Sequence, residues 1–384
     1  MSRPWTELPD LAGQALGGSV MAASDEFFAD KENLIRPEPP TFTPRTFTAK
    51  GQRYDGWETR RRRGPSDRDW TGPDWALVRL GAPGVIRGVV VDTAHFLGNS
   101  PERCAVWATG LEGYPDAAAV AVADWVELVP STPLRGGTQQ RLTVTAERRF
   151  THLRLDIEPD GGVARLRAHG EVVPDPRDWT DLPVDLAAMA NGGTMLAASD
   201  GFYSPPSNML QPGRSRFMGD GWETARRRGG GNDWAVLRLA GPATPLVVEL
   251  DTTHYRGNAP DRAALSGLDA RGPDAVLDDR AAWFPLLPPT ALLPDTTHRF
   301  RLVERRPATH LRLDIYPDGG VGRLRIFGPL TPDGRHALAL RWYNLLPPGQ
   351  AAEVLAAAGL PPDEVARQVA ARPATGLPPA LAPR

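Results

Sequence analysis

Residues 151–167 read THLRLDIEPDGGVARLR, and residues 309–325 read THLRLDIYPDGGVGRLR. In both stretches apolar residues alternate with polar ones on either side of a Pro-Asp-Gly-Gly sequence. Such alternation is typical of half-buried β-strands, and proline followed by glycine is typical of a tight turn. Each stretch therefore predicts two strands joined as a β-hairpin, with the turn at 159–162 or 317–320.

The repeat extends upstream through most of the chain. The matching segments are GGSVMAASD (17–25) and GGTMLAASD (192–200), DGWET (55–59 and 220–224), and DTAHFLGN (92–99) and DTTHYRGN (251–258). A match of this length indicates a duplicated domain, because solenoid units are about 20–50 residues long. The first copy is longer within 36–53 and within 64–74, and both insertions are expected to be surface loops.

Short apolar segments bounded by glycine and proline fill the rest of both copies. They lie at 75–80 and 85–92 in the first copy, and at 234–239 and 246–251 in the second. Strands at short spacing with little helical periodicity are typical of β-sandwiches. The repeats are therefore predicted to be all-β, as two tandem jelly-roll β-sandwich domains at 1–172 and 173–330.

The C-terminal residues 331–384 differ in composition from the repeats. Helix-forming residues dominate at 337–342 and 350–358, and Pro361–Glu364 has the composition of a helix start. The Pro- and Ala-rich segment after Arg372 is expected to be disordered. This region is therefore predicted to be a short helical appendage with a partly disordered tail.

The overall composition of the chain limits the classes of partner and the cellular location that we expect. A formal net charge of -2 gives no long-range attraction to nucleic acid or anionic membranes. The single cysteine, Cys104, excludes an intramolecular disulfide and fits a reducing cytoplasm. No apolar stretch at the N-terminus resembles a secretory signal, and none elsewhere is long enough to span a membrane. We therefore expect a cytoplasmic protein with no nucleic-acid or membrane partner, and the sequence leaves homo-oligomer formation open.

The Asp-Gly-Trp-Glu-Thr segments supply the first candidate site residues, Glu58 and Glu223. Each Asp-Gly dipeptide predicts a turn, so the glutamate is expected at a junction between a loop and a strand. The arginines that follow can bind a carboxylate or a ureido oxygen through paired N–H donors; they are Arg60, Arg61 and Arg226. An arginine run alone is more often a solvated basic surface, but here it recurs with Gly, Trp, Glu and Thr.

The segments at 92–99 and 251–258 supply the second set of candidates. His95 and His254 can act as general acid or base near neutral pH, and Asn99 and Asn258 can bind an amide or a carbonyl group. A single loop histidine is more often structural, but His and Asn recur together. The turn residues Asp160 and Asp318 are mainly architectural and remain secondary candidates for substrate binding; Trp57, Trp75, Trp222 and Trp234 are expected to be core anchors.

Several familiar catalytic and metal-binding patterns are absent from the sequence. It contains no CxxC, HExxH, GxxxxGK[ST] or GxSxG. No metal site is therefore predicted from the spacing of ligand residues, although metal dependence stays open.

With these segments the chain resembles the allantoicase family over residues 1–330. The resemblance implies two jelly-roll domains of the galactose-binding-like type. It also implies a hydrolase acting on linear amidines, which converts allantoate to (S)-ureidoglycolate and urea in allantoin and purine degradation. Weaker action on ureidoglycolate, giving glyoxylate and urea, is a reasonable side reaction. The resemblance implies that no cofactor is required.

The resemblance suggests roles for the candidates and leaves a rival open. Glu58 with His95, or Glu223 with His254, would serve as acid and base. Arg61 or Arg226 would hold the substrate carboxylate. Arg60 has Ala225 as its counterpart, so the copies are not equivalent, and the sequence does not say which one holds the competent site. The rival is a non-catalytic jelly-roll module that binds a small molecule or a carbohydrate.

Overall fold

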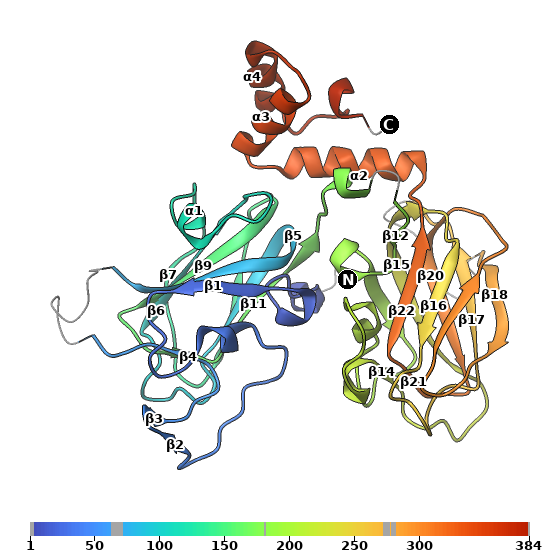
Figure 1. Ribbon diagram of the computed structural model, residues 1–384, viewed down its shortest axis with the longest axis horizontal. Helices are drawn as coiled ribbons and strands as arrows, with labels where there is room; N and C mark the ends of the chain where they lie inside the picture. The colour runs from blue at the N-terminus through green and yellow to red at the C-terminus, as the bar shows by residue number, and fades with distance from the viewer. Residues whose placement is uncertain (1–3, 63–71, 180–181, 272–276, 278–281, 383–384) are drawn as a thin grey trace. The chain divides into compact units, whose positions relative to one another are not determined.

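A computed structural model describes residues 4–62, 72–179, 182–271, 277 and 282–382. The chain divides into two compact units, one formed by 1–173 and 344–373, the other by 174–343 and 374–384. Each unit contains one β-sandwich (Figure 1). The prediction of an all-β fold built from two jelly-roll sandwiches is therefore confirmed.

The first sandwich is organised around one long strand, β5 (Asp74–Asp92), which joins the two predicted strands at 75–80 and 85–92. Its first half pairs with β1 and β9, and its second half pairs with β11 and β8. The sheet order is β1-β5-β9-β6-β7. The bounds are β1 (Ser19–Ala23), β6 (Arg103–Thr109), β7 (Val126–Pro133), β8 (Gln139–Thr143), β9 (Phe150–Glu158) and β11 (Arg165–Val172).

The second sandwich repeats this order in two separate sheets. One has the order β13-β15-β20-β17-β18 and the other β12-β22-β16-β19. Here two strands, β15 and β16, replace the single long strand of the first unit. The bounds are β12 (Val184–Asp185), β13 (Thr194–Ala198), β15 (Asp233–Ala243), β16 (Val247–Asp251), β17 (Arg262–Leu268), β18 (Phe284–Ala291), β19 (Thr297–Arg301), β20 (Ala308–Tyr316) and β22 (Arg323–Gly328).

The predicted β-hairpins are wrong, although the turns are present. β9 pairs with β5 and β6, and β11 pairs with β5, so the strands on either side of the turn are not partners. The same holds for β20 and β22. Alternation shows that each strand has one apolar face, but it does not show which strand lies beside it.

Two short strands follow these turns instead. β10 (Gly162–Val163) pairs with β4 (Trp57–Glu58), and β21 (Gly320–Val321) pairs with β14 (Trp222–Glu223). The turn therefore brings the most strongly repeated stretch of sequence onto the strand that carries a candidate glutamate.

The tryptophans separate into two kinds. Trp57 and Trp222 are fully buried and are core anchors, as predicted. Trp75 and Trp234 are only half-buried, and the guanidinium groups of Arg154 and Arg312 lie over their rings at 5.8 and 5.0 Å. The prediction of a core role is wrong for this second pair, because both side chains are partly exposed and lie beside an arginine.

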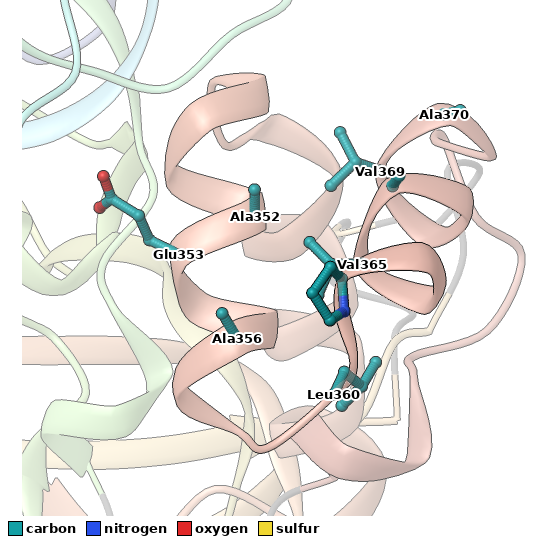
Figure 2. A pocket seen from close by; sticks show the side chains of 9 residues that line it. Ala352, Glu353, Ala356, Leu360, Val365, Val369 and Ala370 are labelled. Atoms are coloured by element: carbon teal, nitrogen blue, oxygen red, sulfur yellow. The ribbon is translucent and has the colours of Figure 1, made fainter.

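Three helices follow the repeats, as expected: α2 (Pro332–Leu345), α3 (Pro348–Ala357) and α4 (Pro362–Ala370). α3 and α4 enclose an apolar groove of about 590 Å³ lined mainly by alanine, valine and leucine (Figure 2). The segment after Arg372, expected to be disordered, is described as far as residue 382 and contains a 3₁₀ turn. None of the described helices has the length and apolar character needed to cross a membrane.

The remaining elements are short. They are β2 (Phe47–Thr48), β3 (Gly51–Gln52), α1 (Ala117–Ala121) and the 3₁₀ turns Trp5–Glu7, Gln14–Leu16, Lys31–Ile35, Pro176–Trp179, Met189–Asn191, Pro206–Leu210, Met218–Asp220 and Pro379–Leu381.

His152 on β9 gives the first unit a pH-dependent stability. The ring is 1% exposed, its Nδ1 lies 2.8 Å from Oγ1 of Thr151, and its Nε2 has no hydrogen-bond partner among the described residues. Burial, with a smaller contribution from Arg79, lowers the pKa of His152 from 6.5 to about 4. Below pH 6.5 the unfolded chain therefore binds a proton that the folded chain resists.

We expect His152 to stabilise the first unit fully above pH 6.5 and to lose about 3 kcal/mol of that stabilisation as the pH falls toward 4. Guanidinium chloride denaturation at several pH values would measure this loss. The variant His152→Gln, which cannot be protonated, should show a shallower decline over the same range. An identical decline in the variant would assign the acid sensitivity to other groups.

Candidate active site

The three repeated segments of each copy meet at the glutamate strand. In the first unit, Thr59 N donates to Gly161 O at 3.1 Å, and Gly162 N donates to Asn99 O at 2.8 Å. Thr224 and Gly319, and Gly320 and Asn258, make the equivalent contacts in the second unit at 3.2 and 2.8 Å. Residues far apart in the sequence therefore form one cluster in each sandwich.

The turn glycines make this convergence sterically possible. A Cβ on Gly161 would lie 2.7 Å from Asn99 O, and its φ of +133° also disfavours a side chain. A Cβ on Gly162 would lie 2.0 Å from the Phe96 ring. The corresponding distances at Gly319 and Gly320 are 2.5 and 1.9 Å. The two glycines therefore allow the turn to pack directly against the loop that carries the asparagine.

A Glu–Asn pair lies at the centre of each cluster. Asn99 Nδ2 donates to Glu58 Oε1 at 2.7 Å, and Asn258 Nδ2 donates to Glu223 Oε1 at 2.7 Å. Each asparagine thus fixes one carboxyl oxygen of the neighbouring glutamate.

The two glutamates differ in environment. Glu58 is 9% exposed, and burial raises the pKa of its carboxyl despite the opposing effects of Asn99 and Arg61. Glu223 is half-buried and therefore more accessible from solvent.

The two histidines have the same unusual backbone conformation, with φ of +70° at His95 and +76° at His254. Their Nε2 atoms lie 3.2 Å from Pro40 O and 3.0 Å from Ser215 O. A carbonyl oxygen only accepts hydrogen bonds, so Nε2 carries the proton and Nδ1 of the neutral ring has the lone pair. The side chain that contacts each glutamate is the asparagine, whereas each histidine is bonded to a loop carbonyl.

The arginines have different surroundings. Arg60 Nε donates to Asp25 Oδ2 at 2.6 Å, and its guanidinium lies 5.6 Å from the centroid of the Phe27 ring. Arg61 is exposed and acts electrostatically on Glu58. Arg226 is also exposed. The first copy thus places two of the predicted arginines beside its glutamate strand.

The turn aspartates contact backbone. Asp160 Oδ2 accepts from Arg62 N at 2.7 Å, and Asp318 Oδ2 accepts from Arg227 N at 2.9 Å. These bonds fasten the arginine-containing segment to the turn.

The model of the allantoicase repeat matches residues 9–173 and 184–331. The chain belongs to the allantoicase family. Its match to the probable allantoicase of Streptomyces coelicolor is 49% identical over 349 residues, which is 89% of this chain and 91% of that protein. Its match to the probable allantoicase of Nocardia farcinica is 51% identical over 330 residues, or 85% and 96% of the two chains.

Solved allantoicase structures share the fold. The crystal structure of allantoicase from Saccharomyces cerevisiae matches with a TM-score of 0.69 and 34% identity, covering 83% of this chain and 92% of that one. A second allantoicase structure matches with a TM-score of 0.70 and 34% identity, covering 84% and 93%.

The allantoicase repeats contain positioning residues that the sequence analysis missed. Arg165 Nη2 lies 3.0 Å from both carboxyl oxygens of Asp55, and Arg323 Nη2 lies 3.2 Å from Asp220 Oδ2. Each ion pair holds the loop before the glutamate strand. The sequence did contain the pattern that identifies these ion pairs, because both members of each pair recur in the two copies.

Asp25 and Asp200 are a second missed pair within the allantoicase repeats. Asp25 Oδ1 accepts from Arg60 N at 3.0 Å, and Asp200 Oδ2 accepts from Ala225 N at 2.6 Å. Both aspartates therefore fasten the segment that follows the glutamate. In the part of the chain that the structure describes, no group of three or more His, Cys, Asp or Glu side chains is arranged to hold a metal ion.

Proposed function

We propose that this chain is an allantoicase that hydrolyses allantoate to (S)-ureidoglycolate and urea, with the Glu–Asn pairs at the reacting centre. The observation that carries the proposal is the recurrence of this pair, at the same 2.7 Å distance, in both allantoicase repeats. The family assignment favours this enzyme over a non-catalytic carbohydrate-binding module.

The chemistry follows from the structure of the substrate. The central carbon of allantoate carries one carboxylate and two ureido groups. Hydrolysis breaks the bond from this carbon to one ureido nitrogen, adds the hydroxyl of water to the carbon and delivers a proton to the departing nitrogen. We assign delivery of that proton to the carboxyl group of Glu58 or Glu223.

The other candidates complete the reaction. Nδ1 of His95 or His254 takes the proton of the attacking water, because Nε2 is already bonded to a carbonyl. Arg61 or Arg226 binds the substrate carboxylate. The asparagine orients the glutamate, and its amide oxygen can accept an N–H from a ureido group. Weaker cleavage of ureidoglycolate to glyoxylate and urea would use the same groups.

The cellular setting is part of the proposal. The near-neutral net charge of -2 supports action on a small molecule without a nucleic-acid partner. The single, buried cysteine supports a cytoplasmic location. Assembly into a homo-oligomer is compatible with the proposed activity.

We expect the purified protein to release urea from allantoate at the same rate with and without a chelator, because side chains fill both the acid and the base roles. Urea and glyoxylate would be followed enzymatically. Loss of urea release after chelation would add a metal to the site. A folded protein that released no urea would contradict the proposed function and favour the binding-module alternative.

A further inference from the structure

An exposed aromatic pair stands beside the glutamate in both copies. Phe27 and Phe28 meet edge to face with centroids 5.1 Å apart, and Phe202 and Tyr203 meet in the same way at 4.9 Å. The exposed fractions are 43% and 36% in the first pair, and 72% and 65% in the second. Two large exposed aromatics that recur at one place point to a ligand or a partner.

The pairs are fixed to the glutamate strands. Phe28 N donates to Glu58 O at 3.2 Å, and Tyr203 N donates to Glu223 O at 3.2 Å. The other ring of each pair follows a turn, in which Asp25 accepts from Phe27 N at 2.9 Å and Asp200 from Phe202 N at 3.3 Å. The backbone that carries each exposed aromatic pair is therefore bonded directly to the backbone of the proposed catalytic glutamate.

The first copy shows what kind of group lies against its exposed aromatic pair, Phe27 and Phe28. The Phe27 ring carries the Arg60 guanidinium at 5.6 Å from its centroid, and Lys50 Nζ at 5.5 Å. A guanidinium is a planar carbon bonded to three nitrogens, and a ureido group is a planar carbon bonded to two nitrogens and one oxygen. The two groups have nearly the same planar shape, so a ureido group, although uncharged, can stack against such a ring through van der Waals contact.

The second copy differs from the first at the position of Arg60. Ala225 stands where the first copy has Arg60, and its backbone N–H keeps the bond to Asp200 while its side chain reaches no further than Cβ. Phe202 is accordingly more exposed than Phe27. The glutamate beside it, Glu223, is also more open than Glu58.

We propose that Phe202 and Tyr203 form the wall that binds a planar ureido group of the substrate, and that the second copy therefore holds the competent site. This inference rests on the proposed function, because it names the group of allantoate that the site recognises. In the first copy Arg60 fills the equivalent place, so the wall at Phe27 does not receive substrate.

The test compares matched substitutions in the two copies of the full-length protein. Binding of allantoate is measured by calorimetry in proteins that also carry Glu58→Gln and Glu223→Gln, so that the ligand is not consumed, and urea release is measured with both glutamates intact. Phe202→Ala and Ala225→Arg should each raise Kd and KM about tenfold, the first by removing a stacking surface and the second by covering it. Phe202→Trp should keep near-normal values, and Phe27→Ala, the matched control, should change both by less than twofold.

The outcomes separate this inference from the proposed function. Unchanged binding in Phe202→Ala, or a larger loss in Phe27→Ala, would overturn the inference. The inference would also be overturned if Phe202→Ala had a lower molar mass than the wild type by light scattering, because the rings would then form an interface between copies of the chain. Binding without urea release in the wild type would sink only the proposed function, whereas the absence of allantoate binding would overturn both.

Discussion

Replacing Glu223 with glutamine is expected to lower kcat for urea release by about 10²–10⁴-fold, which is the usual contribution of positioned proton transfer. Glutamine can keep the hydrogen bond that Asn258 donates, because its amide oxygen replaces Oε1 of the carboxyl group. It cannot deliver a proton to the leaving nitrogen. Steady-state kinetics and the melting temperature of the variant would show lost turnover without lost structure.

The matched variant is Glu58→Gln in the first copy. We expect a smaller loss there, because Glu58 is buried and its aromatic wall is covered by Arg60. A large loss in Glu58→Gln with normal turnover in Glu223→Gln would move the competent site to the first copy. Near-normal turnover in both variants would rule out the glutamates as the proton donors.

Asp55→Ala is expected to lower the free energy of unfolding of the first unit by about 3–5 kcal/mol, the usual result of removing one partner of a buried ion pair. The side chain of Arg165 is 2% exposed and makes two 3.0 Å contacts with the carboxylate of Asp55. Burial raises the pKa of Asp55, but hydrogen bonds from Arg165 and Thr41 outweigh it and hold the pKa below its usual value. The pair is therefore ionised at neutral pH, and the variant leaves the buried guanidinium of Arg165 bonded to backbone carbonyls but without its carboxylate partner.

The control is Glu147→Gln, which removes a partner of Arg87 at the surface of the same unit. The Glu147 side chain is 65% exposed, so the variant should change the free energy of unfolding by about 0–1 kcal/mol. Denaturant titrations of both variants would test the contrast. Equal effects in the two would mean that the Asp55–Arg165 pair contributes no more than an exposed one.

The sequence predicted the strands but not which strands pair with each other. Alternation in 151–158 and 163–167 correctly predicted two strands and a turn, because each strand has one buried face. It suggested a hairpin, since the commonest partner of a strand after a tight turn is its neighbour in the chain. In the folded unit β9 and β11 instead pair with different halves of β5. Side-chain period alone contains no information about this choice.

The site shows the same division. The recurrence of Glu, His, Asn and Arg identified the residues of the two clusters, and the residues Asp55 and Arg165 recur as well. Recurrence did not show that asparagine, rather than histidine, contacts the glutamate. Nor did it single out the aromatic pairs, because Phe28 is replaced by Tyr203 and the neighbouring residues differ.

The sequence by itself determined that this protein is a duplicated all-β chain with a helical C-terminal segment and a recurring set of polar residues. Those features are local or repetitive, so composition, periodicity and self-similarity reveal them. Only the tertiary structure decided that three distant segments meet at each glutamate, and that the second copy leaves its aromatic wall open. The first depends on contacts between residues such as Glu223 and Asn258, which are distant in the chain and are brought together by the packing of the sandwich. The second depends on where the side chain of Arg60 lies in the first copy, over the Phe27 ring.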